Sequence, residues 1–151
     1  MAEALLRARV ARAGLEEDVH VVSAGTWAQP GLPPTPHAVE ALGECGLAWQ
    51  GAMSQAVDAD LMSASALVLV MTRSHAEALR AEFPAQAHKV ILMSELAGGR
   101  WDIADPVGGS LEDYRATRDE LARLIDAGWA GILADAATAS DEGEESVSRL
   151  D

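Results

Sequence analysis

Apolar positions along the chain change between helical spacing and continuous runs, and this alternation predicts a mixed α/β fold. Met1, Leu5, Leu6 and Val10 recur at helical spacing on one face of the first segment. Residues 66–71 form an unbroken apolar run, which is typical of a parallel strand buried on both faces. The whole order of helices and strands predicts a three-layer α/β fold whose parallel sheet has helices on both faces.

Local signals set the limits of these predicted elements. Thr72 is placed to cap one helix, and Ser110 with Asp113 has the spacing of a capping box that opens the last helix. Gly14 ends the first helix by taking a left-handed conformation. The predicted strands are 20–22, 66–71 and 89–93, and the predicted helices are 1–13, 37–44, 58–63, 72–82 and 110–133.

Composition and charge narrow the class of protein. The 151 residues are enough for one domain, which we place at 1–133, and the acidic stretch 134–151 is predicted to be a disordered tail. A net charge of −13 argues against nucleic-acid binding and against an anionic membrane surface. No apolar run reaches the roughly 18 residues of a membrane helix. The single cysteine, Cys45, fits a reducing compartment, so we expect a cytoplasmic location.

Asp105 is the strongest catalytic candidate in the sequence. It precedes Pro106, which disfavours the helical region for the residue before it and therefore holds Asp105 extended in a loop. Gly108 and Gly109 then permit a tight return into the last helix. Such a carboxyl group suits a general acid. The alternative is an ordinary Asp-Pro turn in which Asp105 is only a local hydrogen-bond acceptor.

Other reactive residue types do not form a recognisable site. The histidines at 20, 37, 75 and 88 are scattered, so we expect no metal and no other cofactor. Cys45 lies late in a helix, where it is most simply a small residue at the helix end. Trp27 follows a predicted strand at the edge where parallel sheets bind ligands, so it is either a wall of a substrate pocket or a packing anchor for the proline-rich loop.

Five segments together resemble the low-molecular-weight protein phosphatase family, which includes tyrosine phosphatases, arginine phosphatases and related arsenate reductases. The segments are Met-Ala-Glu-Ala at 1–4, Ser-Ala-Gly-Thr at 23–26, the proline-rich helix start at 34–42, the apolar run ending in Met-Thr at 66–72, and Asp-Pro-Val-Gly-Gly-Ser at 105–110. The resemblance covers residues 1 to about 130. The Gly-Gly-Ser segment and residues 114–121 look closest to the bacterial arginine phosphatases.

This resemblance implies a mechanism and a set of site residues. A phosphocysteine intermediate would form on a phosphorylated protein substrate, and Asp105 would act first as acid and then as base. Trp27 and Val107 would line the substrate pocket. The family's sheet has four strands, and its first strand and cysteine–arginine loop precede the Pro-Met-Ala-Glu-Ala segment. We therefore expect an upstream start, with Met1 as an internal methionine.

Three alternatives remain open from the sequence. The substrate is phosphotyrosine or phosphoarginine, because the side chain that discriminates between them usually lies in the anion loop. An arsenate reductase on the same scaffold would need further redox cysteines besides Cys45. The chain could also be an inactive truncated fragment or an interaction domain without turnover.

Overall fold

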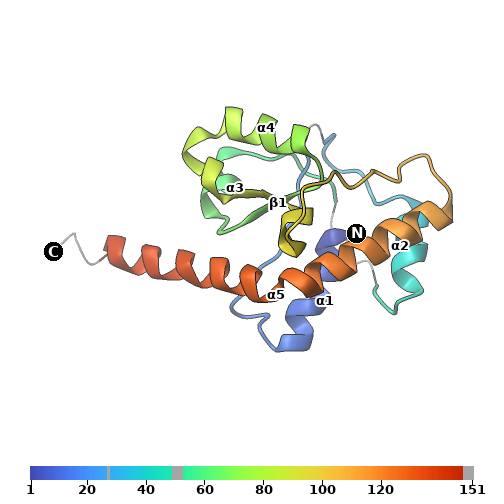
Figure 1. Ribbon diagram of the computed structural model, residues 1–151, viewed down its shortest axis with the longest axis horizontal. Coiled ribbons are helices and arrows are strands. Elements are labelled where there is room, and N and C mark those ends of the chain that lie inside the picture. Colours follow the sequence, from blue (N-terminus) through green and yellow to red (C-terminus); the bar gives the residue numbers. More distant parts are fainter. Residues whose placement is uncertain (27, 49–52, 148–151) are drawn as a thin grey trace.

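The computed structural model describes residues 1–26, 28–48 and 53–147, which are arranged as three layers around a small parallel sheet (Figure 1). Among these residues the sheet has two strands, β1 Val68–Val70 and β2 Val90–Leu92. Their register pairs Val68 with Val90 and Val70 with Leu92. A single parallel bridge joins Gly25 to Ala56 outside these strands.

Helices account for most of the regular structure. Their bounds are α1 Ala2–Ala13, α2 Pro36–Gly43, α3 Ala59–Ala64, α4 Arg73–Glu82 and α5 Leu111–Val147, with two 3-10 helices, η1 Pro84–Lys89 and η2 Met93–Ala97. In Figure 1, α5 runs along one side of the molecule and its C-terminal part extends past the other elements. Within the described part of the chain, no helix combines the length and apolar character needed to cross a bilayer.

The apolar run around β1 supplies both faces of the sheet. Leu67, Leu69 and Met71 pack against a cluster formed mainly by α1 and α5, whereas Val68 and Val70 pack with α3 and α4. The first cluster contains Leu5, Leu6, Leu42, Met93, Ile103, Leu121, Leu124, Ile125 and Ile132. The alternation along one strand confirms the predicted three-layer fold.

The predicted helix signals are confirmed where they can be seen. Thr72 Oγ1 accepts a hydrogen bond from the His75 backbone N–H at 3.2 Å and so caps α4. The Ser110 backbone N–H donates to Asp113 Oδ2 at 2.7 Å, and the Asp113 N–H donates back to Ser110 Oγ at 3.3 Å. Gly14 ends α1 with a φ of 70°.

Two local expectations differ from the structure. Residues 20–22 are not a strand, and the Val21 carbonyl accepts a hydrogen bond from Arg7 Nε at 3.0 Å. A strand requires a neighbour that completes its hydrogen bonds, and no neighbour pairs with these residues in the described structure. The last helix continues to Val147 and not only to about residue 133, because alanine and glutamate favour the helix without an apolar face. The division into a domain at 1–133 and a tail at 134–151 stays a prediction.

Candidate active site at the carboxyl end of the sheet

Asp105 is an exposed residue of the loop that leads from η2 to α5. Its Oδ1 accepts a hydrogen bond from the Val107 backbone N–H at 3.0 Å. The Gly109 N–H donates to the Pro106 carbonyl at 2.9 Å, and Gly108 takes a φ of 83° that favours glycine. The Asp-Pro segment is therefore a tight turn in which Asp105 is a local acceptor, and its exposed carboxylate is also accessible to a substrate.

The front of this loop is joined to the end of β1. The Ile103 backbone N–H donates to the Met71 carbonyl at 2.9 Å, and the Ile103 side chain is only 2% exposed. Asp102 Oδ1 accepts from the Arg73 backbone N–H at 2.9 Å and from Arg73 Nε at 3.3 Å. The backbone N–H and the guanidinium of Arg73 lower the pKa of Asp102 from its ordinary value. The segment before Asp105 is thus held at the carboxyl end of the sheet.

The rear of the loop is fixed by the capping box of α5. The hydroxyl and backbone N–H of Ser110 both donate to Asp113, and these bonds lower the pKa of Asp113. A Cβ added at Gly109 would lie 2.8 Å from Asp113 Oδ2 and 3.0 Å from the Pro106 carbonyl oxygen. The close approach explains why glycine is needed where the loop enters the helix.

The N-terminal end of α1 reaches the same end of α5. Met1 packs against a cluster of Ala38, Ala41 and Tyr114, which joins α2 to the first turn of α5. Burial lowers the pKa of the Met1 amino group. No side chain caps α1 at Met1. The free N–H groups of a helix N-terminus favour an anion, and here they lie close to the helix that the Asp105 loop enters.

A buried carboxylate connects α1 to the segment 21–25. Glu3 is 7% exposed and accepts a short hydrogen bond from the Ser23 hydroxyl. Arg7 Nη2 forms an ion pair with Glu3 Oε1 at 2.8 Å, while Arg7 Nε donates to the Val21 carbonyl. This network fixes the start of the Ser-Ala-Gly-Thr loop against the first turns of α1.

Of the two predicted pocket residues, only Val107 lies in the described part of the chain. Trp27 lies outside the described residues. Val107 lies in the same turn as Asp105, and its side chain is 67% exposed, so it contributes little to the core and is available to a ligand. Their roles as pocket walls stay predictions.

Cys45 is remote from the features expected of a nucleophile. Its exposed thiol lies just beyond the C-terminal end of α2, whereas a reactive thiolate is favoured at a helix N-terminus. The neighbouring Glu44 pairs with Arg115 and Arg118, which together lower the pKa of Glu44 to about 2. Arg118 also donates to the Ala41 carbonyl at 2.7 Å. This end of α2 is therefore tied to α5 by structural ion pairs.

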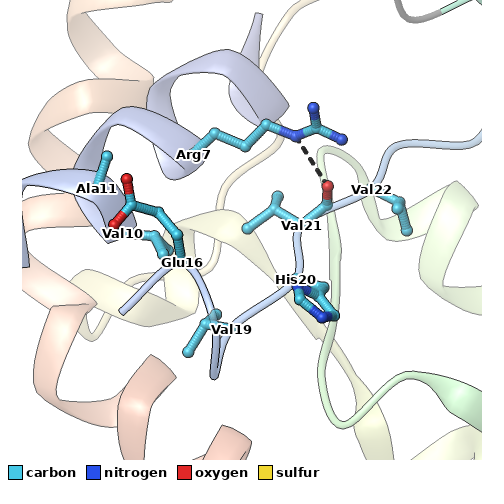
Figure 2. Close-up of a pocket in the computed structure, with 8 residues that line it drawn as sticks. All are labelled: Arg7, Val10, Ala11, Glu16, Val19, His20, Val21 and Val22. Carbon is cyan, nitrogen blue, oxygen red and sulfur yellow. Dashed lines mark hydrogen bonds between the residues drawn. The ribbon is translucent and has the colours of Figure 1, made fainter. Parts of the chain in front are cut away.

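A cavity of about 430 Å³ lies elsewhere, between α1 and the segment 16–22 (Figure 2). Figure 2 shows the Arg7 side chain crossing to the Val21 carbonyl at its rim. The lining residues are Arg7, Val10, Ala11, Glu16, Val19, His20, Val21 and Val22. None of them belongs to the Asp105 loop, although Arg7 and Val21 also belong to the Glu3 network.

Sequence reasoning missed two ion pairs that organise this region. Glu3 and Arg7 have the i, i+4 spacing of a helical ion pair, which was a usable signal. Asp102 and Arg73 are 29 positions apart, so no local pattern predicts their contact. Among the residues that the structure describes, no group of three or more histidine, cysteine or acidic side chains could hold a metal ion.

Comparison with known proteins gives a consistent result. Residues 1–136 match the family described as low molecular weight phosphotyrosine protein phosphatase. A protein-arginine-phosphatase of Bacillus subtilis (strain 168) is 41% identical over 126 residues, which cover 83% of this chain and 82% of the relative.

Solved structures agree with this match. A mutant of the YwlE arginine phosphatase with a phosphorylated active-site serine has a TM-score of 0.78 and 40% identity, covering 83% of this chain and 82% of the other. A low molecular weight protein tyrosine phosphatase from T. tengcongensis has a TM-score of 0.79 and 33% identity, covering 83% and 85%. The predicted family is confirmed and its arginine phosphatase branch is supported: the chain belongs to the low molecular weight protein phosphatase family.

Proposed function

We propose that this chain is a protein-arginine phosphatase in which Asp105 is the general acid and base, with phosphotyrosine as the second candidate substrate. The observation that carries the proposal is the 41% identity to a protein-arginine-phosphatase along most of both chains. The exposed turn that presents Asp105 beside the end of the sheet supports the assignment of the acid.

The proposed reaction has two steps. A cysteine thiolate attacks the phosphorus of phosphoarginine, an S–P bond forms, and the P–N bond breaks as Asp105 protonates the leaving nitrogen. Ionised Asp105 then takes a proton from water, which attacks phosphorus, breaks the S–P bond and releases inorganic phosphate. The relative with a phosphorylated active-site serine supports a covalent intermediate of this kind.

In this proposal the thiolate and a phosphate-clamping arginine lie at the N-terminal end of α1. The uncapped first turn of α1 supports this assignment, because its N–H groups would stabilise a thiolate and a phosphoryl group. An arginine suits the clamp because its planar fork matches phosphoryl oxygens.

The proposal also covers the choice of substrate and the cellular compartment. Trp27 and Val107 are proposed as walls of the substrate pocket. A small side chain at Val107 provides less surface for a phosphotyrosine ring than an aromatic would, which is consistent with phosphoarginine. A thiolate nucleophile needs a reducing compartment, so a cytoplasmic location belongs to this proposal.

The test is a comparison of two proteins on two substrates. The 151-residue chain and a form extended by the upstream codons are assayed for phosphate release from phosphoarginine and phosphotyrosine peptides. We expect the extended form to have the higher kcat/KM on phosphoarginine. An upstream sequence without a cysteine–arginine loop, or an extended form inactive on both peptides, would overturn the proposal.

Two variants in the extended form test the acid. Asp105→Asn should lower kcat by about 10²-fold or more, which is typical of losing a general acid. Asp60→Asn, which changes an exposed carboxylate in the first turn of α3, should leave kcat unchanged. Equal rates for Asp105→Asn and the unmodified enzyme would remove Asp105 from the mechanism.

A further inference from the structure

Three consecutive residues ahead of Asp105 are each bound by a different part of the molecule. Ser94 Oγ donates to the Trp101 carbonyl at 2.8 Å and accepts from the Trp101 N–H at 3.1 Å. Asp102 Oδ1 accepts hydrogen bonds from the backbone N–H and the Nε of Arg73. The Ile103 N–H donates to the Met71 carbonyl at 2.9 Å. The chain is therefore bound to η2, to α4 and to the residue that follows β1 just before it enters the loop.

The contact of Asp102 with Arg73 differs from the contacts of Trp101 and Ile103. Ser94 is fully buried and the Ile103 side chain is in the core, so both positions are set by packing. The Asp102 carboxylate is 42% exposed and contributes little to packing. Its contact is purely polar, and it connects the segment before Asp105 to Arg73, the first residue of α4.

We propose that Asp102 is a positioning residue for Asp105, and this inference rests on the proposed function of Asp105 as the general acid. Only Ile103 and Ala104 separate the two carboxylates in sequence. The far end of the loop is fixed at Ser110 by the Asp113 box. A loop this short transmits a displacement at its front directly to the acid, and misplacing a catalytic group by about 1 Å can cost up to 10²-fold in rate.

The first arm of the test uses the 151-residue chain. Backbone ¹H–¹⁵N heteronuclear NOE values are measured at Val107 and Gly108 in Asp102→Ala and Asp102→Asn. Alanine removes both bonds to Arg73, whereas asparagine keeps an oxygen for the backbone N–H. We expect reduced NOE values in the alanine variant and a smaller reduction in the asparagine variant.

Asp58→Ala is the matched control for this arm. Asp58 also accepts a backbone N–H at a helix start, from Leu61 at 2.8 Å, but it lies at α3 and does not contact the Asp105 loop. It should leave the NOE values at Val107 unchanged. Equal values in Asp102→Ala, Asp58→Ala and the unmodified chain would overturn the inference.

The second arm uses the extended form and measures kcat/KM, which reports the transfer of phosphorus to the thiolate, for phenyl phosphate and for p-nitrophenyl phosphate. Phenolate is the poorer leaving group and needs a well-placed acid more than p-nitrophenolate does. Asp102→Ala should lower kcat/KM by about 10-fold on phenyl phosphate and by less than about 2-fold on p-nitrophenyl phosphate. A purely structural defect would lower both rates alike and would overturn the positioning role.

The two proposals fail in different ways. If Asp105→Asn shows no dependence on the leaving group, the proposed function of Asp105 fails. The NOE arm then still decides whether Asp102 holds the loop, because it requires no turnover.

Discussion

Two extended segments, residues 101–103 and residues 20–22, are held by the rest of the molecule to different degrees. Residues 101–103 make hydrogen bonds to η2, to α4 and to Met71, which follows β1, and Ile103 is 2% exposed. Residues 20–22 lie beside a cavity of about 430 Å³, and Val22 is 51% exposed. Both segments contain strand-forming residues, so their own sequences do not explain the difference. The partners that each segment meets in the fold determine how firmly it is held, and the firmly held segment precedes the candidate acid.

The largest expected effect concerns the core side chains of the two segments. Ile103→Ala should lower the free energy of unfolding by about 3 kcal/mol, because it leaves a cavity in the main core. Val22→Ala should change it by less than about 0.5 kcal/mol, since that side chain is half exposed. Urea unfolding of both variants measures the contrast, and equal losses would show that the two segments are held alike.

A smaller effect is expected at the buried hydroxyl of Ser94. Ser94→Ala removes the partner of both the N–H and the carbonyl of Trp101, which are then left without their hydrogen bonds. The expected cost is about 1–3 kcal/mol in urea unfolding. Ser110→Ala removes an exposed hydroxyl from the rear of the loop and should cost less. A larger loss of unfolding free energy in Ser110→Ala than in Ser94→Ala would contradict the conclusion that the buried contact holds the loop more firmly.

The elements that could be predicted from the sequence have local causes. The apolar run at 66–71 predicted a strand buried on both faces, and the structure places its side chains in two separate clusters. Thr72 and the Ser110–Asp113 pair predicted helix starts through hydrogen bonds that span three residues. Such signals depend only on residues that are near in sequence, so they can be recognised without knowledge of the tertiary fold.

The elements that could not be predicted depend on distant partners. Residues 20–22 have a strand-like composition, but a strand forms only beside another strand. Asp102 meets Arg73 across 29 positions, and Glu44 meets Arg115 across 71. The site was predicted to the extent that Asp105 was located in a loop, while the residues that hold this loop emerged only from the structure.

The smallest expected effect is the pH dependence of the Asp102 contact. The pKa of this carboxyl is lowered in the folded protein, so its stabilising contribution is present above its unfolded pKa of about 3.9 and is lost as pH falls through the folded value. The difference in urea midpoint between the unmodified chain and Asp102→Asn should therefore be constant from pH 7 to 5 and shrink by pH 3. A difference that persists unchanged at pH 3 would mean that the charge of Asp102 does not contribute.

The most direct test of the central claim is kcat/KM for phosphoarginine and phosphotyrosine peptides, measured in the extended enzyme with and without Asp105→Asn. The account predicts a preference for phosphoarginine and a loss of about 10²-fold or more in the variant. A preference for phosphotyrosine would contradict the substrate assignment, and an unchanged rate in the variant would contradict the role of Asp105.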